Sequence, residues 1–182
     1  MRITSKQILN VLYVLSFILF VGVCIDACGF IFSAFYTMTI NSVNAKTTWP
    51  GVDLSALYSW DRGHFLVQLT YMSIVGVLKA IQFYLLLKIL HDKKLNFSQP
   101  FNKETGRLIS SLAFLAIGAG LFSSWGAKYT AWIETNGVPM PDVQDLRLGG
   151  ADVWLYMGAI LFVIAQIFKR GIEIQTENDL TV

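Results

Sequence analysis

The sequence has few charged residues. Only 14% of its 182 residues are Asp, Glu, Lys or Arg, whereas soluble domains carry about 25%. Hydrophobic residues make up 54% of the chain, and its mean hydropathy is +0.54. This balance argues against an ordinary soluble domain and indicates a membrane protein. The net charge of +2 is too small to indicate direct binding of nucleic acid.

Cysteine and histidine are also scarce. Cys24 and Cys28 are the only cysteines, and both lie in one apolar run, so they cannot form a disulfide framework. A zinc site needs about four ligands, and the two histidines, His64 and His91, are predicted to lie on opposite sides of a membrane. We therefore expect no metal and no bound cofactor. The chain also lacks a G-x-S-x-G elbow and an HExxH-like spacing, so no catalytic residue is predicted and an enzyme is not favoured.

Long apolar runs dominate the rest of the chain, at residues 8–36, 65–87, 108–126 and 152–169. About 20 apolar residues span the hydrocarbon of a bilayer, and backbone polar groups in lipid require internal partners, which helices provide. The first run is about twice as long as the apolar part of a signal peptide, so it is predicted to stay as a membrane helix. The sequence therefore predicts one all-α domain: an integral membrane four-helix bundle made of two helical hairpins.

Local signals place some of the helix starts. Asn102 is a predicted N-cap, with Glu104 in the first turn, where the helix dipole favours an anion. Asp53 is predicted to cap a short helix in LSALYSW, whose aromatic residues suit a membrane–water interface.

Lysine and arginine are unevenly divided between the connections. Nine lie at the N-terminal start, in residues 88–107 or in the tail after Phe168, and four lie in the two other connections. The positive-inside rule then places both termini and the central loop in the cytoplasm. The prediction is a multi-pass protein of the cytoplasmic membrane.

Four polar residues stand at or inside the predicted spans, where a charged side chain costs about 2.5–3.5 kcal/mol at mid-bilayer. We take them as a candidate intramembrane polar site: Asp26, Lys79, Gln166 and Asp152. A direct Asp26–Lys79 pair is the less favoured arrangement, because their backbone levels differ by roughly 13 Å. The alternative places Asp26 near the outer interface and extends Lys79 toward a polar boundary.

Small residues form a stripe beside each of these charges. On the first helix the stripe is Gly22, Asp26, Gly29 and Ser33, and on the second it is Ser73, Gly76 and Ala80. Small residues let helices approach closely in lipid. Both stripes are therefore predicted to face the bundle.

Two stretches carry a family resemblance. One is Gln99-Pro100-Phe101 followed by NKETGRLI, and the other is AQIFKRGIEIQTENDLTV, from Ala165 to the end. Together with four spans in this length, they resemble the bacterial domain-of-unknown-function 2975 (DUF2975) membrane family. The resemblance implies a small four-span protein of the bacterial cytoplasmic membrane with no assigned chemistry. It also implies a gene that often lies beside one for a small helix-turn-helix regulator.

The favoured function is an interaction or regulatory role at the cytoplasmic face, with a small helix-turn-helix regulator as the partner. The candidate partner surface comprises Pro100, Phe101, Arg107, Lys169, Arg170, Glu173, Glu177 and Asp179. One alternative is a small transporter or channel subunit, which would act as a homo-oligomer because four spans are few. Another is a lipid- or quinone-binding protein whose pocket is lined by outer aromatic residues: Trp125, Tyr129, Trp132 and Trp154.

Overall fold

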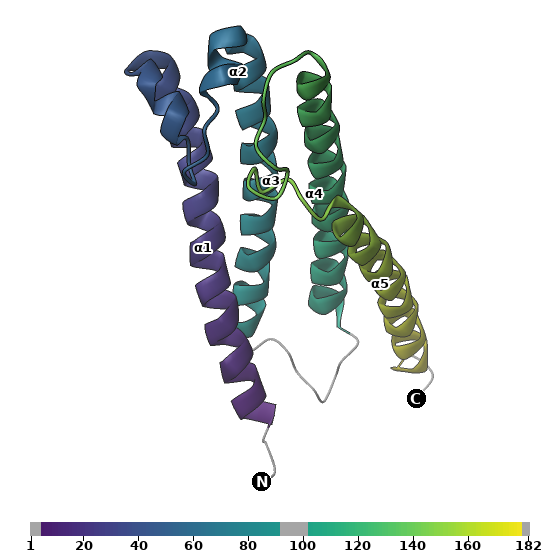
Figure 1. The fold of residues 1–182 in the computed structure, drawn as a ribbon. Helices are drawn as coiled ribbons and strands as arrows, with labels where there is room; N and C mark the ends of the chain where they lie inside the picture. Colours follow the sequence, from purple (N-terminus) through teal and green to yellow (C-terminus); the bar gives the residue numbers. More distant parts are fainter. Residues whose placement is uncertain (1–4, 92–101, 180–182) are drawn as a thin grey trace.

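The computed structural model describes residues 5–91 and 102–179, and these residues form helices joined by loops (Figure 1). Four helices are long: α1 (Ser5–Thr39), α3 (Arg62–His91), α4 (Lys103–Thr135) and α5 (Ala151–Asp179). Two are short: the 3-10 helix η1 (Ser42–Thr47) and α2 (Ser55–Trp60). Within the described residues the only β-type pairing is one isolated bridge, between Thr48 and Val52. The predicted all-α class is confirmed.

Each of the four long helices is long and apolar enough to cross a membrane. They contain all four predicted apolar runs and extend past both ends of each. At 1.5 Å per residue, the 35 residues of α1 cover about 52 Å, more than the roughly 30 Å of a hydrocarbon core. The apolar side chains of Val11, Val14 and Ile18 are 67%, 56% and 62% exposed. Exposing such an apolar surface to water is unfavourable, whereas a lipid environment would cover it.

The long helices stand in a row instead of a closed bundle. Helix α1 packs on α3, α3 on α4, and α4 on α5, and no other pair of long helices packs together in the described parts of the chain. Figure 1 shows the start of α1 and the end of α5 at the same end of the molecule. The two predicted hairpins, α1–α3 and α4–α5, are therefore present, but the bundle is open between α1 and α5.

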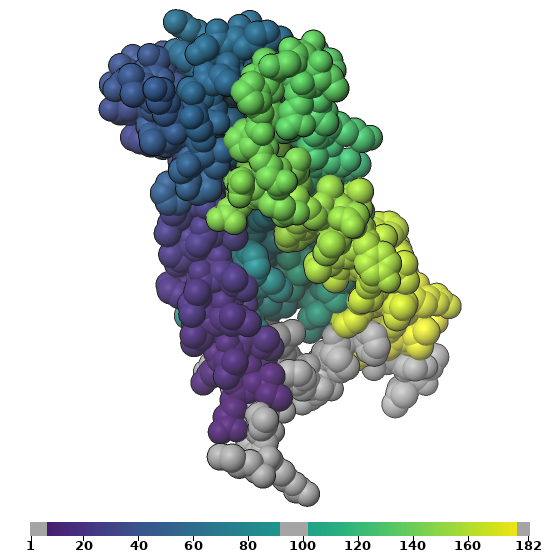
Figure 2. Space-filling view, in the orientation of Figure 1, coloured from purple at the N-terminus to yellow at the C-terminus, as the bar shows by residue number. Residues whose placement is uncertain are grey.

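Two loops turn back from the end that carries α2 and run down along the helices (Figure 1). The short loop, residues 48–53, lies between η1 and α2, and the long loop, residues 136–150, lies between α4 and α5. Figure 2 shows the long loop, in bright green, covering the space between the helices at this end. Below it a recess remains open between α1 and α5. We call the end that carries α2 the α2 end, and the end where α4 begins and α5 finishes the basic end.

The hydrophobic core lies at the α2 end. Its fully buried side chains include Phe30 of α1, Leu57 of α2 and Phe65 of α3. The long loop adds Leu146 and Leu148, both 0% exposed. This loop is therefore part of the packed interior and holds a fixed place between the helices.

The predicted N-cap of α4 is confirmed, whereas at α2 the N-cap residue is Leu54 and Asp53 lies one residue before it. The Asn102 side chain accepts a hydrogen bond of 2.7 Å from the Thr105 amide, and Glu104 lies in the first turn of α4. The Asp53 carboxylate accepts one of 2.8 Å from the amide of Ser55, the first residue of α2. Both side chains satisfy backbone donors that have no partner inside the helix.

Candidate functional site

The candidate site is built around Asp26 in the middle of α1. Its carboxylate accepts a hydrogen bond of 3.0 Å from the indole Nε1 of Trp49, in the short loop. The other carboxylate oxygen lies 3.6 Å from Nε of Arg147, in the long loop. One carboxylate on a helix therefore holds both descending loops.

Arg147 has an unusual backbone. Its φ of 58° lies in the left-handed region, which residues other than Gly, Asn and Asp seldom adopt. Its carbonyl oxygen accepts a hydrogen bond of 3.4 Å from Nζ of Lys79. Arg147 thus joins Asp26 on α1 to Lys79 on α3, through its side chain and its backbone respectively.

Lys79 has a second contact, with an aromatic ring of α5. Its ammonium lies 5.3 Å from the centroid of the Trp154 ring, in the first turns of α5, within the range of a cation–π interaction. Lys79 therefore bridges the long loop and α5, although α3 and α5 do not otherwise pack together in the described residues. We call Asp26, Lys79, Arg147 and Trp154 the ion cluster.

The ion cluster lies about halfway along α3, a helix that is long and apolar enough to cross a membrane. Lys79 is nine residues from Lys88, a cation in the last turn of α3 at the basic end. The Lys79 backbone therefore lies about 14 Å from that of Lys88 along the helix. The hydrocarbon core is about 30 Å thick. Non-helical backbone is tolerated at such depth only where it is buried in protein or lines a water-filled cavity. The two loops pack on the core and border a cavity, so they would be tolerated at such depth in a bilayer.

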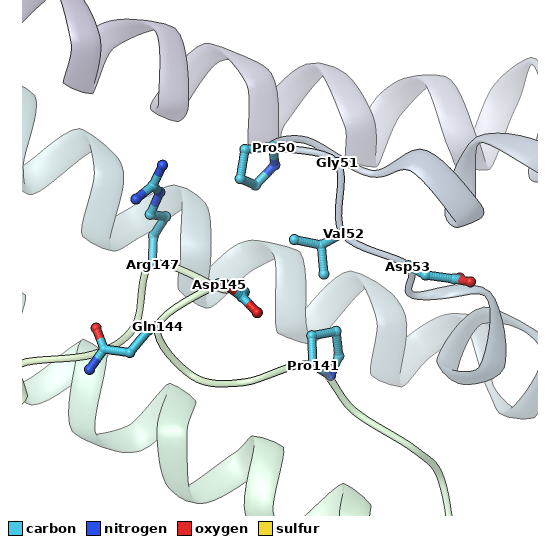
Figure 3. Close-up of a pocket in the computed structure, with 8 residues that line it drawn as sticks. All are labelled: Pro50, Gly51, Val52, Asp53, Pro141, Gln144, Asp145 and Arg147. Carbon is cyan, nitrogen blue, oxygen red and sulfur yellow. The ribbon is translucent and has the colours of Figure 1, made fainter.

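This cavity has a volume of about 760 Å³ and lies between the two loops (Figure 3). Its lining residues are Pro50, Gly51, Val52, Asp53, Pro141, Gln144, Asp145 and Arg147. Figure 3 shows the Arg147 side chain extending toward α1, with Asp53 at the other side of the cavity, beyond Val52. The lining therefore presents a cation at one side and the Asp53 carboxylate at the other, with Asp145 beside Arg147.

Asp53 stays ionised over a wide pH range. Hydrogen bonds from the Ser55 side chain and backbone lower the pKa of its carboxyl, and the Lys46 cation acts in the same direction. The cavity therefore keeps a negative charge at Asp53 under mildly acidic conditions.

The small-residue stripe on α1 faces a loop instead of a helix. A Cβ added at Gly29 would collide with the Trp49 indole, and the buried Ser33 hydroxyl accepts a 3.1 Å hydrogen bond from the Trp49 amide. Gly22 has open space around it. On α3, Gly76 lies against Ala27, where an added Cβ would be 3.1 Å from the Ala27 Cα. Gly76 on α3 therefore faces the neighbouring helix as predicted, whereas the α1 stripe seats Trp49 and leaves Gly22 open.

The structure brings together only two of the four residues of the predicted intramembrane site. Asp26 and Lys79 meet through Arg147 instead of pairing directly. Asp152 is exposed in the first turn of α5, where the helix dipole favours a carboxylate. Gln166 lies twelve residues beyond Trp154, about 18 Å further along the same helix. The prediction of one shared site is therefore wrong for Gln166, because α5 carries it to the basic end.

Gln166 instead lines a second cavity, of about 610 Å³, between α4 and α5. We call this cavity the basic cleft. Its lining residues are Lys103, Gly106, Arg107, Ser110, Ser111, Phe114, Ala165, Gln166, Lys169, Ile172 and Glu173. On each helix they recur at a spacing of three or four residues, so each helix contributes one face.

The predicted partner surface is divided by this cleft. Arg107, Lys169 and Glu173 line it, and Arg170 pairs with Glu173 at 3.1 Å on exposed surface. Glu177 is exposed near the end of α5, and Asp179 is its last residue. Pro100 and Phe101 lie outside the described residues.

The aromatic residues predicted to line an outer pocket do not form one group. Tyr129 and Trp132 stack on each other and contact the His64 ring at tilted angles, near the α2 end. Trp125 contacts Phe122, and Trp154 belongs to the ion cluster.

Sequence reasoning missed Arg147 and Trp49, the two loop residues that complete the site around Asp26. The pattern LRLGG was interpreted only as part of an outer connection. A signal was present, because a loop that alternates leucines with a charged residue and ends in Gly149-Gly150 has the composition of a buried segment.

Comparisons of this chain with models of protein families, with curated proteins and with solved structures return no match. Among the residues that the structure describes, no group of three or more His, Cys, Asp or Glu side chains is placed to hold a metal ion.

Proposed function

We propose that the chain is a multi-pass protein of the bacterial cytoplasmic membrane, with both ends and the central segment in the cytoplasm. Nine of its lysines and arginines lie on that side and four in the two other connections, as the positive-inside rule requires. The start of α1 and the end of α5 at one end of the molecule support this orientation (Figure 1). The basic end is then cytoplasmic, and the cavity between the loops opens outside.

The family resemblance remains part of the proposal. The stretch NKETGRLI and the tail from Ala165 support membership of the DUF2975 family. An alignment of homologous chains in which both stretches vary freely would contradict it.

We propose an interaction or regulatory role, in which the cytoplasmic end of α5 binds a small helix-turn-helix regulator. The observation that carries this role is the length of α5. The helix continues to Asp179, ten residues past Lys169, and so projects about 15 Å beyond the predicted span. Arg170, Ile174 and Glu177 recur on one exposed face of this projection, and such a stripe suits docking into a groove of a partner.

The geometry also connects this end with the ion cluster. Helix α5 packs along α4 alone among the long helices of the described chain, and Trp154 at its other end contacts Lys79. A change at the outer cavity that moves Lys79 or the long loop would therefore act on a helix held by a single neighbour. This gives a regulatory protein a direct path from its outer side to its inner side.

The test is recovery of a tagged helix-turn-helix regulator with the full chain from bacterial membranes. Ile174 is 46% exposed, and Ile174→Glu would place a charge where the partner buries an apolar side chain. We expect this variant to reduce recovery by about tenfold, the usual scale for a lost hot-spot contact. The matched control, Gln175→Glu, adds the same charge on a different face and should leave recovery unchanged. Recovery equal to that of the wild-type chain, both with Ile174→Glu and with a chain ended after Phe168, would reject the role.

A second candidate function is solute binding or transport by an oligomer. It is favoured by the cavity between the loops, which borders the guanidinium of Arg147. If the ion cluster lines a solute path, Asp26→Asn and Lys79→Met should abolish flux in reconstituted vesicles. Unchanged flux in both variants would reject this candidate.

A further inference from the structure

We propose that the basic cleft binds an anionic glycerophospholipid of the cytoplasmic leaflet. The ligand would place its phosphate at the mouth of the cleft and its acyl chains along α4 and α5. This site lies at the opposite end of α5 from the ion cluster. It rests on membrane insertion and the proposed orientation, and it does not depend on the regulatory role.

The charges at the mouth of the cleft favour an anion. Lys103, Arg107 and Lys169 contribute three cations, and Glu173 is the one carboxylate among the lining residues. Arg170, which is outside the lining, already pairs with Glu173 at 3.1 Å. The three lining cations therefore meet little opposing charge inside the cleft.

The next layer of the cleft offers hydrogen-bonding side chains. Ser110 and Ser111 on α4 face Gln166 on α5 across the cavity. Hydroxyl and amide groups donate to the ester and phosphate oxygens of a lipid headgroup. They lie one to two turns inside the cations, where the glycerol backbone of a lipid would lie if its phosphate met Arg107 and Lys169.

The deep end of the cleft is apolar. Phe114 and Ala165 close the lining, and the Phe114 ring meets that of Phe162 at 5.8 Å between centroids. Phe114 is 63% exposed, so the cleft continues into a hydrophobic helix surface. A free phosphate or a soluble anion would leave this part uncovered, whereas a lipid covers all three layers. Basic pockets between membrane helices on the cytoplasmic side are known sites for such headgroups.

The experiment measures lipid retention by native mass spectrometry of the purified full chain. Phosphatidylglycerol and phosphatidylcholine with identical acyl chains are added in separate samples. We expect the wild-type chain to retain phosphatidylglycerol, and Arg107→Gln/Lys169→Gln to reduce that retention roughly tenfold. The matched control, Lys46→Gln/Lys128→Gln, removes two positive charges from the α2 end and should retain the lipid as wild type does. The charge-conserving Arg107→Lys/Lys169→Arg should also retain it, which separates loss of charge from loss of folding.

Three outcomes would overturn the proposal. Equal retention of both lipids by the wild-type chain would show that charge does not select the ligand. Equal retention of phosphatidylglycerol by the Gln variant and the wild-type chain would place the lipid elsewhere. If inorganic phosphate alone displaces phosphatidylglycerol at matched concentration, the cleft is a site for free anions.

Discussion

The guanidinium of Arg147 lies 3.6 Å from the carboxylate of Asp26, so a loop residue from late in the chain meets the middle of the first helix. The same Arg147 offers its carbonyl oxygen to Lys79. Gly76 lies against Ala27, so the backbones of Lys79 and Asp26 lie at similar levels and the predicted offset of roughly 13 Å is wrong. The two charged side chains, on neighbouring helices, are joined by a third residue instead of pairing directly. This arrangement accounts for the position of the long loop, which turns back among the helices.

The strength of this contact is open to a double-mutant cycle with Asp26→Asn, Arg147→Gln and the double variant. The two side chains are 26% and 55% exposed, and a pair at that exposure contributes about 0.5–1 kcal/mol. Thermal or denaturant unfolding of the four proteins in detergent should give a coupling energy of this size. A coupling energy of zero would show that the long loop is held by its buried leucines, Leu146 and Leu148.

Arg147 is held in a backbone conformation that glycine adopts at lower cost. Arg147→Ala and Arg147→Gly both remove the side chain, but only Gly relieves the positive φ of 58°. We therefore expect the Gly variant to be more stable than the Ala variant by about 1 kcal/mol. Equal unfolding temperatures would contradict the left-handed conformation.

The seat of Trp49 on α1 gives a matched pair of substitutions on one helix stripe. Gly29→Ala forces the indole to move and should cost about 1–3 kcal/mol, as overpacking does, because an added Cβ collides with it. Gly22→Ala meets open space and should be neutral or stabilise by up to about 1 kcal/mol through helix propensity. Unfolding temperatures of the two variants in one detergent compare them directly.

The orientation can be tested by labelling single cysteines. After replacement of Cys24 and Cys28 by Ala, a cysteine is placed at Ser42, near the α2 end, or at Lys103, at the basic end. An impermeant maleimide should label Ser42→Cys in intact cells, and Lys103→Cys only after permeabilisation. The reverse pattern would invert the proposed topology.

The lowered pKa of Asp53 predicts a pH dependence of stability. Because the folded-state pKa lies below the unfolded value of about 3.9, the stabilisation is present above that value. It is lost as pH falls through the folded pKa. Asp53→Asn can accept the same hydrogen bond without titrating, so the difference in stability between wild type and variant should shrink as pH falls below about 4. A difference that is constant down to acid unfolding would contradict the assignment.

The sequence alone predicted the elements that depend on local pattern. The four helices of membrane-spanning length followed from hydropathy, and the Asn102 cap followed from residue type. The ion cluster could not be predicted in this way. Arg147 reaches Asp26 only because a loop without periodicity turns back between the helices. Gln166 was grouped with the wrong residues because membership of one span does not give depth along it. The row of helices also depends on tertiary packing, which periodicity does not encode.

The position of the hydrophobic core predicts which part of the protein loses its structure first when lipid is removed. The largest buried side chains, such as Phe30, Leu57 and Phe65, lie toward the α2 end, whereas those buried toward the basic end are mostly alanines, such as Ala113, Ala116 and Ala165. Toward the basic end, α1 has largely exposed side chains and relies on its surroundings for cover. Backbone amides around Leu69 should therefore resist deuterium uptake long after those around Val11 have exchanged, once lipid is stripped away. The α2 end should therefore keep its structure without lipid, whereas the part of α1 toward the basic end would need a bilayer to cover its apolar side chains.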